Sequence, residues 1–181
     1  MPIALETIRP LAAHEIDRLE PLWLALHEHH VRAEPRVAGM AARSRDASWR
    51  RRRVAYLRWM ADPETFVLVA ETGDELVGYA FVTVAAGYSV WDSGRRAAQL
   101  ETLSIAPLMR GQGLGERLLA SVRERLAGAG IETLVLTVAC ANDGAQRFYA
   151  RHGFRRAELL LVGATATDQD HYGGGGSNAR T

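Results

Sequence analysis

The stretch that most constrains this chain covers residues 99–115. An apolar segment ends at Pro107, and three glycines at alternate positions then lead into a helical pattern: Gly111, Gly113 and Gly115. This order predicts a strand, a tight loop and a helix. Glycines spaced in this way allow left-handed backbone conformations and bring several N–H groups against one ligand, and the helix N-terminus adds partial positive charge. The stretch therefore predicts a binding site for a phosphate or a pyrophosphate.

Two common phosphate loops have a different spacing. A Walker loop needs Lys followed by Ser or Thr after its last glycine, whereas Gly115 is followed by Glu116 and Arg117. In a dinucleotide fingerprint the place of Glu116 belongs to glycine, and the next strand ends in an acid, where this chain has Thr137 and Val138. The sequence therefore predicts neither a nucleoside triphosphate site nor a dinucleotide site.

The spacing that remains, Arg110-x-x-Gly113-x-Gly115, resembles the acetyl-coenzyme A binding motif of the GNAT superfamily of N-acetyltransferases. A second match lies downstream and resembles the closing motif of that family: Asn142-x-x-Ala145-x-x-Phe148-Tyr149, then Gly153-Phe154. The two motifs occur in the right order, separated by one predicted helix and one predicted strand, so a chance agreement is improbable. The resemblance covers roughly residues 8–162.

The resemblance implies the GNAT fold, an α/β (α+β) arrangement. Its central sheet is mixed and mostly antiparallel, has six to seven strands with strands 4 and 5 parallel and splayed, and is flanked by about four helices. Residues 1–165 are expected to form one acetyltransferase domain, and the glycine-rich residues 166–181 a flexible tail with little to bury. Hydrophobic spacing and turn signals predict strands over 3–8, 66–70, 76–84, 99–106, 131–138 and 154–162, and helices over 13–31, 47–61, 114–128 and 142–153.

Length and charge set the broad class. A chain of 181 residues is long enough for one domain with a sizeable core, and 22 basic against 21 acidic side chains give a net charge of +1. No global field therefore points to nucleic acid or to a membrane. Because no signal peptide or membrane span is recognisable, a cytoplasmic location is expected. The single cysteine, Cys140, cannot form an internal disulfide, and it is expected to be buried beside a strand end.

A run of four arginines, residues 50–53, lies on the second predicted helix. Such a run usually forms a solvated helix face. The functional alternative is attraction of an acidic acceptor or of the adenosine 3′-phosphate of coenzyme A. Nucleic-acid binding is less favoured, because the run is short and only Trp49 and Tyr56 lie near it as stacking aromatics.

The acceptor side is less constrained than the donor side. In the resembled family the first helices wall the acceptor pocket, so candidates for substrate contacts are His27, Glu28 and His30. The two histidines have no cysteine or carboxylate at a recognisable metal-ligand spacing, so no metal is expected. In loop 86–96, Trp91 and Asp92 suit a cationic amine, although the loop is equally well explained as a hairpin tip with surface aromatics.

The donor side follows from the resemblance. The pantetheine arm is implied to pair with the backbone of the strand before the glycines, in the manner of an added strand. The pyrophosphate is implied to lie on the glycine loop, and Asn142 to cap its helix and contact the arm. The candidate acetyl-coenzyme A residues are Leu103, Ser104, Ile105, Arg110, Gly111, Gln112, Gly113, Leu114, Gly115, Glu116, Asn142, Phe148 and Tyr149.

Two residues are candidates for catalysis. An acetyl thioester is already activated, so the enzyme needs only a free amine and a proton for the leaving thiolate; an alkylammonium has a pKa of roughly 10 and must first lose a proton. Glu101 matches the carboxylate that serves as base in many family members, often through water. Some relatives carry a glutamate on the next strand, but Thr137 occupies that place. Tyr149 matches the tyrosine that donates to the coenzyme A sulfur.

These residues predict an N-acetyltransferase that moves an acetyl group from acetyl-coenzyme A to a primary amine of a small molecule. A peptide or protein amine is an alternative acceptor, and a non-catalytic acyl-coenzyme A sensor is an alternative function. The presence of both Tyr149 and Glu101 favours the enzyme. The resemblance also implies a homodimer as one arrangement, because family members often dimerise through their last strands.

Overall fold

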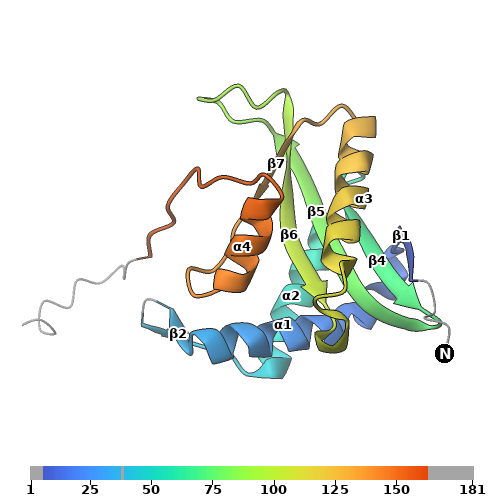
Figure 1. Cartoon of the computed structure of the whole chain (residues 1–181), viewed down its shortest axis with the longest axis vertical. Helices are drawn as coiled ribbons and strands as arrows, with labels where there is room; N and C mark the ends of the chain where they lie inside the picture. The colour runs from blue at the N-terminus through green and yellow to red at the C-terminus, as the bar shows by residue number, and fades with distance from the viewer. Residues whose placement is uncertain (1–5, 38, 163–181) are drawn as a thin grey trace, which may run out of the picture.

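A five-stranded sheet forms the centre of the part of the chain that the computed structural model describes, residues 6–37 and 39–162 (Figure 1). Its strands, in spatial order, are β1 (Thr7–Pro10), β4 (Phe66–Thr72), β5 (Glu75–Ala86), β6 (Arg96–Ile105) and β7 (Thr133–Leu136). The first four pair antiparallel, and β6 pairs with β7 in parallel. This mixed, mostly antiparallel sheet with one parallel pair confirms the predicted fold class.

In the described residues, four α-helices and two short 3₁₀ helices accompany the sheet. They are η1 (Ala13–Leu19), α1 (Glu20–Ala33), α2 (Arg45–Trp59), η2 (Pro107–Met109), α3 (Leu114–Gly128) and α4 (Asp143–Arg151). A two-stranded hairpin, β2 (Arg36–Val37) with β3 (Met40–Ala41), connects α1 to α2. The helix predicted over residues 13–31 begins as the 3₁₀ helix η1 and continues as α1.

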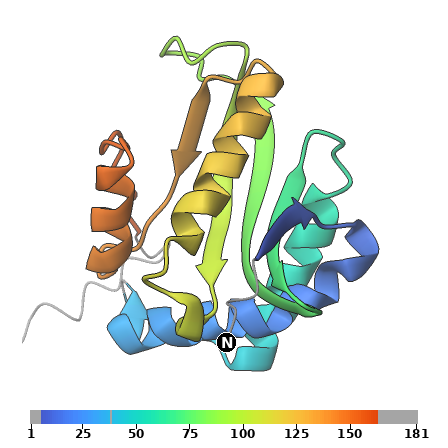
Figure 2. The same cartoon turned by 45° about the vertical axis from the view of Figure 1, so that its right-hand side comes forward.

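Helices cover both faces of the sheet (Figures 1 and 2). Alternate residues of a strand point to opposite faces. On β5, Ala80 and Val82 pack in a core with α3, whereas Tyr79 and Phe81 pack in a second core with η1, α1 and α2. Because both faces are covered, the residues 66–70 of β4 are all buried, which explains their continuous apolar sequence.

Two predictions fail near the C-terminal end of the described chain. Residues 154–162 form no strand, and the leucines 159–161 are exposed, so the sheet of the described chain has five strands rather than six or seven. An apolar segment becomes a strand only where a neighbouring backbone pairs with it, and this segment runs away from the sheet after Phe154 (Figure 1). Cys140 is exposed rather than buried, because β7 ends at Leu136 and a surface turn follows. The predicted tail, residues 166–181, lies outside the described residues.

Candidate active site

The parallel pair β6 and β7 separates before β6 ends. Ala97 to Leu100 of β6 pair with Thr133 to Leu136 of β7, whereas β6 continues to Ile105 beside β5 (Figure 2). Within the described chain, residues 101–105 therefore have one backbone edge without a strand partner. Such an edge presents N–H and C=O groups that can pair with an extended ligand. The candidate donor residues Leu103, Ser104 and Ile105 lie on this edge.

Glu101 lies at the point where the two strands separate. It is the extra residue of a β-bulge, because Phe81 pairs with Thr102 while the next residue, Val82, pairs with Leu100. The hydroxyl of Thr83 donates to Glu101 Oε1 at 2.9 Å. Thr83 alternates with Val82 and so faces the same side as Phe81. The Glu101 carboxylate consequently lies on the side of the sheet that α1 and α2 cover.

The glycine loop follows the free edge directly. Gly111 and Gly113 have φ angles of 76° and 78°, in the left-handed region, and Gly113 is the N-cap of α3. Among the described residues, the amide groups of residues 111–116 have no hydrogen-bond acceptor. The loop is braced by its own side chains, since Arg110 Nε donates to Ile105 O at 3.1 Å and Gln112 Nε2 to Leu108 O at 2.8 Å. The result is a row of free N–H donors at a helix N-terminus, which is the setting that binds phosphate groups.

Helix α4 brings the second motif to the first. Asn142 caps α4 by accepting from the Ala145 amide at 3.1 Å, which confirms its predicted capping role. Phe148 reaches the first turn of α3, because a Cβ placed on Gly115 would lie 3.6 Å from Phe148 Cζ and 3.8 Å from Ile105 Cγ1. The two motifs therefore meet beside the end of β6.

Tyr149 lies next to Phe148 in a small aromatic cluster. Its ring is edge-on to Phe148 at 5.2 Å and to Phe154 at 5.4 Å between centroids. Burial raises the pKa of the Tyr149 phenol to about 12. The phenol therefore keeps its proton at neutral pH and can act as a donor.

A hollow of about 330 Å³ lies between α1 and α2; we call it the α1–α2 hollow. It is lined by Trp23, Arg43, Ser48, Arg51, Arg52, Ala55 and Trp59. Trp23 Nε1 donates to Ser48 Oγ at 3.1 Å, which ties one wall to α2. Behind it, the buried Tyr56 hydroxyl bonds with the Tyr79 hydroxyl at 3.0 Å and with Thr102 Oγ1 at 2.7 Å. These contacts link the hollow to the strand residue that follows Glu101.

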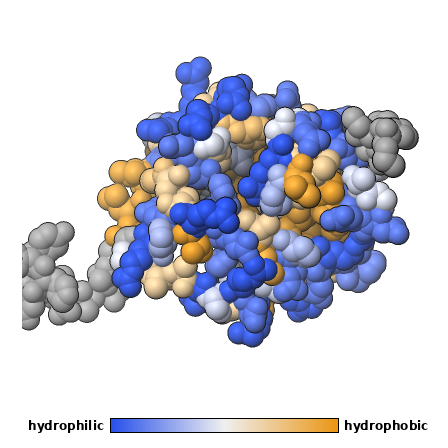
Figure 3. Space-filling view, turned by 60° about the horizontal axis from the view of Figure 1, so that its bottom comes forward, coloured by the Kyte–Doolittle hydropathy of each residue, from blue (hydrophilic) through white to orange (hydrophobic). Residues whose placement is uncertain are grey.

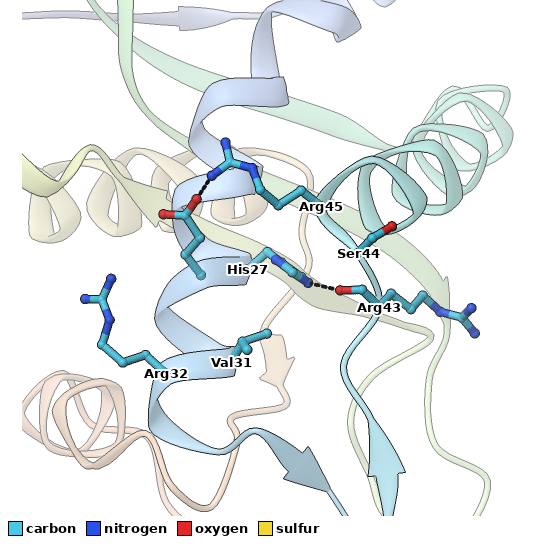
Figure 4. A pocket seen from close by; sticks show the side chains of 7 residues that line it. His27, Val31, Arg32, Arg43, Ser44 and Arg45 are labelled. Carbon is cyan, nitrogen blue, oxygen red and sulfur yellow. Dashed lines mark hydrogen bonds and ion pairs between the residues drawn. The ribbon is translucent and has the colours of Figure 1, made fainter.

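The predicted acceptor residues fall into two separate places. A second hollow, of about 390 Å³, is lined in part by His27 and Glu28; His27 Nε2 bonds with the Arg43 carbonyl at 3.1 Å and Glu28 pairs with Arg45 (Figure 4). His30 lies exposed on the same helix. Trp91 and Asp92 are exposed in the β5–β6 loop, at the opposite end of the sheet from α1 and η2 (Figure 1). The structure therefore does not bring this pair together with the α1 residues.

Two features were not predicted from the sequence. One is the bulge at Glu101, which has no local signal because it depends on the register with β5. The other is the aromatic wall around Arg52, although its spacing of Arg52, Tyr56 and Trp59 at i, i+4 and i+7 on a helix indicated a shared face.

Two kinds of feature are absent from the described chain. Residues 6–37 and 39–162 contain no group of three or more His, Cys, Asp or Glu side chains arranged to hold a metal ion. No helix in this part combines the length and the apolar composition that a membrane crossing requires. The surface at the end of the sheet that carries α1 and η2 is mainly hydrophilic, with apolar patches between the charged side chains (Figure 3).

Known proteins share both the sequence pattern and the fold. The chain is 27% identical over 150 residues to mycothiol acetyltransferase of Corynebacterium efficiens, which covers 81% of this chain and 44% of the relative. It is 34% identical over 113 residues to streptothricin acetyltransferase of Streptomyces lavendulae, covering 61% of this chain and 56% of the relative. The chain thus spans about half the length of these two relatives.

Among solved structures, a GCN5-related N-acetyltransferase from Ralstonia eutropha JMP134 superposes with a TM-score of 0.72 at 21% identity, covering 90% of this chain and 100% of that one. At this identity the likeness concerns the fold. The model of the Acetyltransferase (GNAT) family matches residues 23–154, which include both motifs, the free edge of β6 and the α1–α2 hollow. The chain belongs to the Acetyltransferase (GNAT) family.

Proposed function

We propose that this chain transfers an acetyl group from acetyl-coenzyme A to a primary amine of a small molecule. The observation that carries the proposal is the continuity between the free edge of β6 and the glycine loop. An extended arm with two amides would lie along residues 101–105, and a pyrophosphate attached to that arm would lie on the amides of residues 111–116. Members of the family use acetyl-coenzyme A, which has both parts in this order.

The remaining donor residues fit this placement. Arg110 already donates its Nε to the end of β6, and the rest of its guanidinium is available for a phosphate oxygen. Asn142 and Phe148 would border the arm from the side of α4. Leu114 and Glu116 would contribute through their backbone amides, because Leu114 is buried in the core with α3 and Glu116 carries a charge that repels phosphate.

Glu101 is the proposed base. Its carboxylate lies at the junction of β6 and β7, on the side of the sheet where α1 and α2 leave the α1–α2 hollow. It would take the proton of the acceptor ammonium, directly or through one water. The free amine then attacks the thioester carbonyl, so that an N–C bond forms and the C–S bond breaks. One of the two protons still on the attacking nitrogen leaves to water as the tetrahedral intermediate collapses, and the other stays on the amide product.

Tyr149 is the proposed acid. The leaving coenzyme A thiolate would take the phenol proton, and solvent would return that proton to Tyr149. Because its pKa is raised to about 12, the phenol is protonated throughout the neutral range. The products are an N-acetyl amine and coenzyme A, and no acyl-enzyme is required. The names of both relatives refer to small molecules, which supports a small-molecule acceptor.

The proposal is tested by calorimetric titration with acetyl-coenzyme A, followed by a thiol-release assay over a panel of amines. Micromolar binding together with thiol release on particular amines is the expected result. Binding without release on any amine would favour the sensor function. Absence of binding would refute the assignment of the glycine loop and of the β6 edge.

A further inference from the structure

The α1–α2 hollow has a one-sided charge. Of the seven described residues that line it, three are arginines, Arg43, Arg51 and Arg52, and none is acidic. In the described part of the chain these three have no carboxylate partner, whereas the neighbouring Arg53 pairs with Asp17 and Arg45 pairs with Glu28. Within the arginine run of α2, Arg53 is therefore paired with a carboxylate, whereas Arg51 and Arg52 leave their positive charge in the hollow.

Arg52 is held in a way that leaves its donors unused. Its guanidinium lies 4.3 Å from the centre of the Trp23 ring, 5.4 Å from Tyr56 and 5.7 Å from Trp59. Aromatic rings contact the face of a guanidinium, whereas its N–H groups radiate in the plane and match the two oxygens of a carboxylate. No side-chain hydrogen bond of Arg52 to another described residue is formed. The rings thus hold the Arg52 guanidinium in place, while its N–H groups stay free to bind an anion.

The hollow also offers apolar surface. Trp23 and Trp59 are among its lining residues, and Ala55 adds a small apolar side chain. An apolar group that packs against the indoles would be removed from water, while a charged group on the same molecule reached the arginines. The combination does not suit a polyamine, because each ammonium would meet like charge.

The hollow lies on the side of the sheet that carries the proposed base. Trp59 contacts Phe81 at 5.7 Å between ring centroids, and Tyr56, which Arg52 overlies, bonds with Thr102 next to Glu101. The hollow and the Glu101 carboxylate therefore lie on the same face of the sheet.

From these observations we infer that the acceptor is a primary amine that also carries a carboxylate and an apolar side chain, with the carboxylate held by Arg51 and Arg52. The inference rests on the proposed acetyl transfer, and it names the chemical class of the acceptor. Arg43 adds positive charge at the rim shared with the second hollow.

The test compares acceptors that differ only in this charge. Thiol release is measured with L-phenylalanine and L-phenylalaninamide, with L-leucine and L-leucinamide, and with spermidine as a cationic reference. We expect kcat/KM to be at least about tenfold higher for the acid in one pair or more. The amino group of an α-amino amide is less basic than that of the acid, so at neutral pH a larger fraction of it is the free amine that attacks. Intrinsic reactivity would therefore favour the amide and cannot produce a preference for the acid.

Two variants of neighbouring residues locate the effect. Arg51→Gln removes an arginine that lines the hollow, and Arg50→Gln removes the exposed arginine beside it on α2, which does not. We expect Arg51→Gln to raise KM for the acid and to reduce the acid-to-amide ratio at least about fivefold. Arg50→Gln should keep the ratio of the wild type.

Binding is followed independently by tryptophan fluorescence, because Trp23 and Trp59 line the hollow. A fluorescence change on adding the acids supports the anion site if it is absent in Arg51→Gln and present in Arg50→Gln. If this change occurs but no amine releases thiol, the proposed acetyl transfer fails and the anion site stands. Thiol release with amides or spermidine at rates equal to or above those of the acids overturns the inferred class and leaves acetyl transfer intact. Absence of both the acid preference and the fluorescence change also overturns it.

Discussion

Gly113→Glu tests the glycine loop most directly. Gly113 has a φ of 78°, and a Cβ built on it has no atom of another described residue within 4 Å. The substitution therefore meets open space, and its cost to folding is the left-handed backbone, about 1–2 kcal/mol. For a chain of this size that corresponds to a fall in Tm of about 2–8 °C. The cost to binding is separate, because the new carboxylate would stand among the amides that face the pyrophosphate.

The loss of affinity follows from charge. A carboxylate roughly 4 Å from one phosphate charge costs about 4 kcal/mol at the effective dielectric constant of a protein surface. This corresponds to roughly a thousandfold in Kd, and solvent screening leaves an expected loss of at least about a hundredfold. Gly113→Gln, which adds the same bulk without the charge, should lose clearly less.

Gly130→Glu is the matched control. Gly130 follows the other end of α3 and has a φ of 68°, and a Cβ built on it also has no neighbour within 4 Å among the described residues. It should lower Tm to a similar extent and leave the Kd for acetyl-coenzyme A unchanged. Calorimetry gives the Kd, and circular dichroism gives the Tm. If Gly113→Glu bound acetyl-coenzyme A as tightly as Gly130→Glu, the loop would not be the phosphate site.

Three further predictions concern single side chains. Tyr149→Phe should lower kcat at least about tenfold with little change in the Kd for acetyl-coenzyme A; unchanged turnover would assign the proton to water. Glu101→Gln keeps a hydrogen-bond acceptor for Thr83 but removes the base. The kcat/KM of this variant should therefore be low near pH 6 and recover towards about pH 10, where the amine deprotonates unaided. A pH profile parallel to that of the wild type would contradict the role of Glu101 as base. A hydrogen bond from Arg9 lowers the pKa of Glu71 from its ordinary 4.5 to about 2, so its stabilisation is complete above pH 4.5 and is lost as the pH falls towards 2. The Tm difference between wild type and Glu71→Gln should shrink over that range, and a constant difference would refute the linkage.

The sequence was most informative where a short pattern fixes the backbone locally. The glycines of residues 111–115, the capping Asn142 and the apolar stripe of α3 all act within a few residues, and each is found where the pattern predicts it. The prediction of a final strand over residues 154–162 was wrong for the opposite reason. The leucines 159–161 have strand-like composition, but pairing needs a second backbone, and no local signal says whether one is present.

The acceptor side depends on contacts between distant segments. Trp23 and Arg52 lie on different helices, and only their packing creates the guanidinium fork of the hollow. The same holds for the arginine run, whose members looked equivalent in the sequence. Asp17 neutralises Arg53 from η1, whereas Arg51 and Arg52 are left in a hollow, so partners from outside α2 decide what each arginine does.

The bulge and the separation of the parallel strands occur at the same point of β6, and this coincidence organises the proposed chemistry. Up to Leu100, β6 is paired on both sides; beyond it, β7 has left and Glu101 is the extra residue. The free edge of β6 can thereby pair with acetyl-coenzyme A beside the glycine loop, while the bulge places the Glu101 carboxylate on the face of the sheet that α1 and α2 cover. Donor and acceptor would thus reach the same backbone position from opposite sides of the sheet. Removing the bulge by deleting Glu101 should therefore abolish transfer even if acetyl-coenzyme A still binds, which calorimetry and thiol release together would measure.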